Sequence, residues 1–122
     1  MPTLLVLAPP SAETDDLLSS LVGRTDLNLL IVTNVSGAEV ALRDIAVSLV
    51  LLSPETDAET VTTVLDRTEE LRRGTPSLVL RRRGGEPLAA WTGRSVGILQ
   101  GPVSPEVLSR TVDVALGLGT HP

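Results

Sequence analysis

Five short apolar runs, separated by segments with helical patterns, constrain this sequence more than any other feature. Their apolar character is continuous rather than alternating, which is typical of parallel strands covered by helices on both faces. Each run is bounded by Pro, Gly, Ser or Asn. We therefore expect a five-stranded parallel sheet between two layers of helices. The runs are TLLVLA (3–8), LNLLIVTN (27–34), VSLVLLS (47–53), SLVLR (77–81) and VGILQ (96–100).

Helix signals fill the segments between these runs. Ser36, with Glu39 three residues on, predicts the start of the second helix as a capping box, and Val40 is expected to face inward. Ser104 followed by Pro105 predicts the start of the last helix, because Pro is favoured at the first helical position. The predicted helices cover residues 12–23, about 37–44, 57–73, about 86–92 and 105–116.

Five strands alternating with five helices predict a flavodoxin-like (βα)5 fold of the α/β class. The sheet is expected to be doubly wound and parallel, with five strands in the order 2-1-3-4-5. The 122 residues and 42% hydrophobic content suit one core. Residues 1–122 are therefore interpreted as a single domain, either alone or within a longer protein. Ligands of such sheets bind at the carboxyl ends of the strands.

The composition excludes several functions. The net charge of -5 and a pI near 4.7 argue against direct nucleic-acid binding, which needs a concentrated positive field. All ten basic residues are Arg and there is no Cys, so lysine-amine and thiolate chemistry are absent. The first apolar run is short, lacks a basic region and meets Pro9 and Pro10. We therefore expect no signal peptide, no membrane contact and a cytoplasmic location.

Two segments resemble the receiver domains of response regulators, the CheY-like superfamily. They are VSLVLLSPE (47–55) and GILQGPVSPEVLSRTV (97–112). The second is similar to a receiver's last strand, loop and helix, where a lysine, a proline and S-P-E-x-L follow one another. The resemblance extends over roughly residues 3–118. It implies two-component signalling, in which an acidic pair holds Mg²⁺, an aspartate accepts a phosphoryl group and a lysine pairs with the phosphoryl oxygens.

The sequence departs from the receiver pattern at each of these positions. Ala8 and Pro9 stand in place of the acidic pair, Ser53 in place of the phosphoacceptor, and Gly101 in place of the lysine. Phosphoryl transfer needs a carboxylate nucleophile and a divalent ion with oxygen ligands. The resemblance therefore implies a degenerate receiver, or pseudo-receiver, with no catalytic residue, no Mg²⁺ or other metal, and no cofactor.

The two switch positions of a receiver are also altered. A Thr or Ser and an aromatic residue are matched here by Arg81 and Ile98. Arg81 also begins the basic run of Arg81, Arg82 and Arg83, at the carboxyl end of a predicted strand. These arginines are candidates for binding an anion or an acidic partner segment. A solvated charge run in a loop is the plainer interpretation.

Trp91 is the only aromatic residue, and Arg94 follows it closely. Trp and Arg are enriched at interface hot spots, although Trp91 could equally fill a gap in an aliphatic core. The resemblance places Trp91, Arg94 and Ile98 on the face where receivers dimerise or bind partners. We therefore regard these three residues as a candidate interface for a protein partner or a second copy.

The first hypothesis is a non-enzymatic, phosphorylation-independent receiver-like domain for protein interaction or dimerisation in bacterial signalling or transcription regulation. The alternative is a small-molecule or anion sensor that uses the Arg81–Arg83 loop. An enzyme on this fold comes last, because Ser53 lacks a plausible base. The lone His121 lies at the end of the chain.

Overall fold

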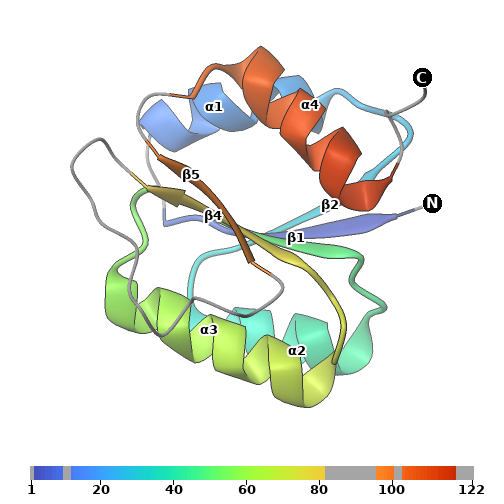
Figure 1. The fold of residues 1–122 in the computed structure, drawn as a ribbon, viewed down its shortest axis with the longest axis vertical. Helices are drawn as coiled ribbons and strands as arrows, with labels where there is room; N and C mark the ends of the chain where they lie inside the picture. The colour runs from blue at the N-terminus through green and yellow to red at the C-terminus, as the bar shows by residue number, and fades with distance from the viewer. Residues whose placement is uncertain (1, 10–11, 82–95, 101–102, 118–122) are drawn as a thin grey trace.

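The computed structural model describes residues 2–9, 12–81, 96–100 and 103–117, and shows one sheet between two pairs of helices (Figure 1). The elements in chain order are β1 (Thr3–Leu7), α1 (Ala12–Val22), β2 (Asn28–Val32), α2 (Val35–Asp44), β3 (Leu49–Leu52), α3 (Ala58–Leu71), β4 (Ser77–Arg81), β5 (Val96–Gln100) and α4 (Pro105–Leu116).

The predicted sheet is confirmed. Its five strands are all parallel and lie in the order β2-β1-β3-β4-β5. Helices α1 and α4 cover one face, and α2 and α3 cover the other (Figure 1). The helix predicted at about 86–92 lies outside the described residues. No helix in the described ranges is long and apolar enough to cross a membrane.

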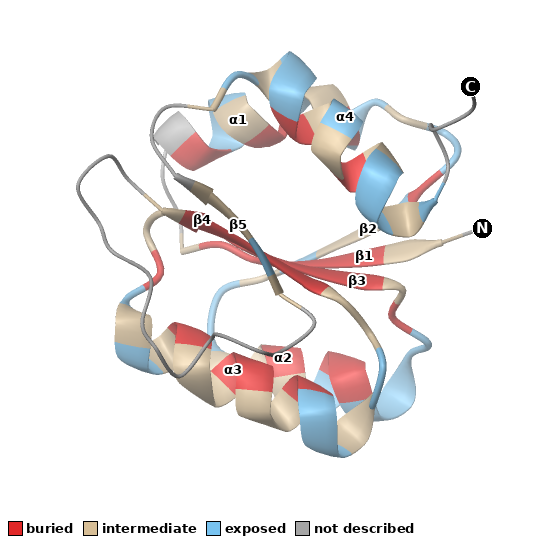
Figure 2. Cartoon of the chain, in the orientation of Figure 1, coloured by how far each residue is buried: buried red, intermediate tan, exposed pale blue. Residues whose placement is uncertain are grey.

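Alternate residues of the central strands divide the core into two halves. Leu5, Leu7, Val50 and Leu52 pack with α2 and α3, whereas their neighbours along the strands pack with α1 and α4. Because β1, β3 and β4 contribute side chains to both halves, these three strands are almost wholly buried (Figure 2). Their continuous apolar sequence reflects that two-sided burial.

The expectation that every strand is covered on both faces is wrong for β2. This strand pairs only with β1, so one edge has no strand beside it. Its Ile31 is 46% exposed, and none of its five residues is fully buried. An edge strand receives less cover than a central one, as the predicted order 2-1-3-4-5 already implied for the second strand.

Helix α2 begins two residues earlier than the sequence predicted. Asn34, not Ser36, is the N-cap, and its side-chain oxygen accepts a hydrogen bond from Gly37 N at 2.8 Å. Glu39 pairs with Arg67 of α3 at 3.1 Å instead of completing a capping box. Val40, expected to face inward, is 53% exposed, and Ala38 and Ala41 are buried beside Leu42. The small side chains of Ala38 and Ala41 allow α2 to pack closely against the core.

The start of α4 is as predicted, and a cluster of polar contacts fixes this helix in place. Ser104 is its N-cap and accepts a hydrogen bond from Val107 N at 3.2 Å. Arg24, in the loop after α1, pairs with Asp113 of α4 at 2.7 Å and with Asp26 of its own loop at 2.9 Å. The hydrogen bond with Asp26 is the main cause that raises the pKa of Arg24 above its ordinary value.

Candidate functional site

Ser53 follows β3 directly, at the carboxyl edge of the sheet. Its backbone N–H donates to Leu7 O of β1 at 3.1 Å, which holds the ends of the two strands together. The side chain is 2% exposed, and its Oγ lies 3.2 Å from Oγ1 of Thr56, which is also buried. The Ser53 hydroxyl is therefore engaged within the protein and has almost no contact with solvent.

Arg81 connects the end of β4 to the same loop. It is the last residue of β4, and its Nη1 donates to Thr56 O at 3.3 Å. Thr56 N in turn donates to Ser53 O at 3.1 Å. The loop between β3 and α3 is thus held by its own turn and by a guanidinium from the neighbouring strand.

The residues that follow β1 complete this edge of the sheet. Ala8 is buried, and its N–H donates to Val32 O of β2 at 2.9 Å. Pro9 lines a crevice of about 280 Å³ between the ends of β1 and β2 and the first residues of α2 and α3. We call it the carboxyl-edge crevice. Its lining residues are Leu7, Pro9, Thr33, Asn34, Val35, Glu55, Thr56, Asp57 and Thr60.

Two carboxylates stand in the wall of the carboxyl-edge crevice. Asp57 is the N-cap of α3 and accepts a hydrogen bond from Thr60 N at 3.3 Å. This interaction lowers the pKa of Asp57 below its ordinary value, so the side chain is charged at neutral pH. Glu55 is the second carboxylate. Among the described residues, no group of three or more His, Cys, Asp or Glu could hold a metal ion.

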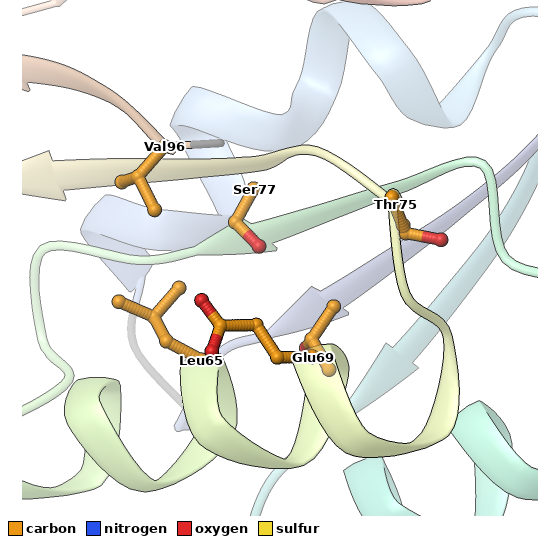
Figure 3. A pocket seen from close by; sticks show the side chains of 7 residues that line it. Leu65, Glu69, Thr75, Ser77 and Val96 are labelled. Carbon is orange, nitrogen blue, oxygen red and sulfur yellow. The ribbon is translucent and has the colours of Figure 1, made fainter. Parts of the chain in front are cut away.

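A second cavity lies at the opposite edge of the sheet. The side chains of Leu65 and Glu69 on α3 face those of Ser77 and Val96 across it (Figure 3). Ser77 and Val96 are the first residues of β4 and β5, so this cavity is remote from Ser53. Its volume of about 50 Å³ has room for only a few water molecules. It is therefore not part of the carboxyl-edge site.

The candidate residues divide into those the structure brings together and those it does not describe. Ala8, Pro9, Ser53 and Arg81 lie at one edge of the sheet. Ile98 lies in the middle of β5, opposite Val79, and packs partly buried against the core that also contacts α2 and α3. The remaining candidates lie outside the described residues: Arg82, Arg83, Trp91, Arg94 and Gly101.

The arrangement of strands, helices and loops is that of known receiver domains. A receiver domain protein from Methanospirillum hungatei JF-1 superposes with a TM-score of 0.76 at 16% identity, over 96% of this chain and 94% of its own. The signal receiver domain of an HD domain-containing protein from Pseudomonas fluorescens Pf-5 gives 0.77 at 19%, over 95% and 94%. The receiver domain of a Francisella response regulator gives 0.75 at 11%, over 98% and 100%. This chain has the receiver fold.

This chain shares the receiver fold with these proteins but has no close sequence similarity to them. No family model matches the sequence, and no curated protein does. Ser53 and Ala8 directly follow the third and first strands of this fold. The residue that sequence reasoning missed is Thr56. Its position just before the N-cap of α3 gave no signal that its hydroxyl meets Ser53 and its carbonyl meets Arg81.

Proposed function

We propose that this chain is a receiver-like domain that acts without phosphorylation and without catalysis, by binding a protein partner or a second copy of itself. The observation that carries the proposal is the buried Ser53 at the end of β3. A receiver has its phosphoacceptor aspartate at this position. Here a neutral hydroxyl lies 3.2 Å from the hydroxyl of Thr56, and a hydroxyl that is not activated by a base is a weak nucleophile.

The position of Arg81 supports the same proposal. In receivers, a small hydroxyl residue at the end of the fourth strand responds to the phosphoryl group. Arg81 occupies that position and donates to Thr56 O. The loop after β3 is therefore contacted by a guanidinium group from within the same chain. This contact suits a loop that stays in one conformation and presents one fixed surface.

Arg81 also supports the alternative function, a domain that senses an anion. It lies at the carboxyl edge of the sheet, where open α/β sheets bind their ligands, and begins the arginine run. We place this function second, because the guanidinium of Arg81 is half-buried and already binds a backbone carbonyl.

The partner proposal leads to a pull-down prediction. We expect the purified, unphosphorylated domain to capture a protein from native cell extract, or a tagged second copy of itself, as identified by mass spectrometry. We expect a Trp91→Ala, Arg94→Glu bait to lose that capture, because Trp and Arg at an interface centre contribute most of its binding energy.

The control for this experiment is an Arg43→Glu bait. Arg43 is exposed on α2 and is not one of the residues of the proposed interface, so the substitution makes the same change in charge at another surface position. It should retain the captured protein. Capture that is equal with all three baits would exclude the proposed interface. A native bait that captures nothing specific would favour the anion sensor.

A further inference from the structure

Strand β2 presents an open edge that lacks the features by which sheets usually protect such edges. Among the described strands its only neighbour is β1, and it pairs with β1 over five consecutive residues without a bulge. Natural sheets protect their edges with charged residues, Pro or bulges, because exposed backbone groups bind another strand. Residues 27–34 contain no charged residue, no Pro and no Gly. This edge is therefore suited to pairing with a further strand.

The backbone groups that face outward are those of Leu29 and Ile31. The N–H of Asn28 and the C=O of Val32 each form a hydrogen bond of 2.9 Å to the segment that contains β1. Alternate residues of a parallel strand bond to the same neighbour, so Leu30 also directs its backbone groups towards β1. The N–H and C=O groups of Leu29 and Ile31 then point away from β1. The side chain of Ile31 is itself 46% exposed.

A second large apolar side chain is exposed beside this edge, on α2. Gly37 of α2 lies so close to β2 that a Cβ atom there would be 3.2 Å from Cβ of Val32. Helix α2 also contacts β1, so it lies over the β1–β2 pair. Val40 follows Gly37 by three residues, which makes the two neighbours on the helix surface. Val40 is 53% exposed.

We propose that β2 pairs antiparallel with β2 of a second copy, around a two-fold axis at Leu30, so that the two sheets become one. This register places Leu29 of each copy opposite Ile31 of the other. The outward N–H and C=O groups of both residues then form four hydrogen bonds between the copies. A two-fold interface uses the same surface on both copies, as this pairing does. We call the paired strands the β2 joint.

Charge and spacing both favour a second copy as the occupant. Each copy has a net charge of -5, so two copies repel over much of their surface, and the uncharged segment 27–34 opposes their contact least. Adjacent strands lie about 4.8 Å apart, so two α2 helices, each above its own β1–β2 pair, would have axes about 10 Å apart. Packed helices have axes about 8–10 Å apart. The β2 joint would therefore cover Ile31 and Val40 together.

The β2 joint rests on the proposed interaction function, of which it specifies the self-association. It is separate from the Trp91 interface, because Ile98 of that interface lies in β5, at the other edge of the sheet. One short strand and part of one helix are fewer than the about 20–30 residues a side of a standard interface. We therefore expect a weak dimer that forms at high concentration and dissociates during the washing of a pull-down. The pull-down and the tests below thus report on different surfaces.

Sedimentation equilibrium over a series of protein concentrations tests the dimer. We expect a reversible rise from 12.8 kDa towards twice that mass. Ile31→Lys should raise the dissociation constant at least about tenfold, because it places a charge within the joint. Val107→Lys is the matched control, since Val107 is an apolar residue of α4 with a similar exposure of 42%. The control should dimerise as the native chain does.

Cysteine cross-linking tests the register. The chain has no Cys, so one introduced thiol can form a disulfide only between two copies. Leu30→Cys places the thiols on directly opposite residues with Cα atoms about 4.5 Å apart, within the range of a disulfide. Ile31→Cys places them on diagonal residues about 7–8 Å apart, which a disulfide does not span. We expect oxidised glutathione to cross-link Leu30→Cys and not Ile31→Cys, although residue 31 is the more exposed.

Several outcomes would overturn the proposal. They are a native chain that stays at 12.8 kDa at every concentration, an unchanged dimer in Ile31→Lys, equal loss of the dimer in Val107→Lys, or faster cross-linking of Ile31→Cys than of Leu30→Cys. A monomeric native chain would leave the edge open to a strand from a different protein. A partner captured through Trp91 in the pull-down is unaffected by these outcomes. Failure of the β2 joint would therefore leave the interaction function in place.

Discussion

Leu51→Ala should lower the free energy of unfolding by about 2–5 kcal/mol, the usual cost of removing a fully buried Leu side chain. Leu51 lies in the central strand β3, is 0% exposed, and is paired in register with Val6 and Leu78. All three side chains belong to the half of the core beneath α1 and α4. A domain of this size has about 5–15 kcal/mol of stability in total. Denaturant unfolding followed by circular dichroism measures the loss.

The matched control for this prediction is Ile31→Ala in the edge strand β2. Ile31 is 46% exposed, so the substitution removes a side chain that is already half in water and should cost about 1 kcal/mol or less. Equal losses at the two positions would contradict the assignment of β3 to the centre of the sheet and of β2 to its edge.

Arg24→Met should lower the free energy of unfolding by about 2 kcal/mol, in line with hydrogen bonds to charged groups. The Arg24 side chain is 19% exposed and contacts Asp26, Ser109 and Asp113. Removing the guanidinium leaves the carboxylate of Asp113 without this partner. Arg43→Met, at an exposed position of α2, should change the stability by no more than about 0.5 kcal/mol. Similar losses in the two variants would contradict the role of Arg24.

The ion pairs of Arg24 with Asp26 and Asp113 also predict that the stability of the domain depends on pH. The hydrogen bond from Arg24 lowers the pKa of Asp26 below its ordinary value of about 3.9. A lowered pKa gives stability that is fully present above the unfolded-state pKa and is lost as the pH falls through the folded-state pKa. The native chain should therefore lose this contribution below about pH 4. In the Arg24→Met variant, the free energy of unfolding should fall less over the same pH range. Denaturant unfolding measured at a series of acidic pH values checks this.

Most of the fold could be predicted from the sequence, because continuous apolar runs identify buried parallel strands. The errors concern α2, where tertiary packing determines the first residue of the helix and the face that is buried. Ser36 and Asn34 are both good N-cap residues, and only the hydrogen bond to Gly37 distinguishes them. Val40 follows the helical spacing of an inward residue, but α2 buries the smaller Ala38 and Ala41 instead. In α2, the helical spacing of apolar residues did not identify the face that packs closely against the core.

The candidate site was only partly accessible from the sequence. The resemblance to receivers located Ala8, Ser53 and Arg81, and the fold brings these residues to one edge of the sheet. The carboxyl-edge crevice could not be predicted, because it forms where Pro9, Asn34 and Asp57 meet from three separate loops. Long-range proximity of this kind depends on the register of β1 with β2 and β3. A single sequence does not give that register.

The central claim, that the domain acts without phosphorylation, is tested most directly by the intact mass of the protein after incubation with acetyl phosphate and MgCl₂. A receiver with the complete acidic pair, aspartate and lysine serves as the positive control in the same buffer. We predict that the control gains one phosphoryl group and that the mass of this chain stays unchanged, because the residue that directly follows β3 is a buried serine and not an aspartate. A phosphoryl adduct on this chain at a yield comparable to that of the control would contradict the claim.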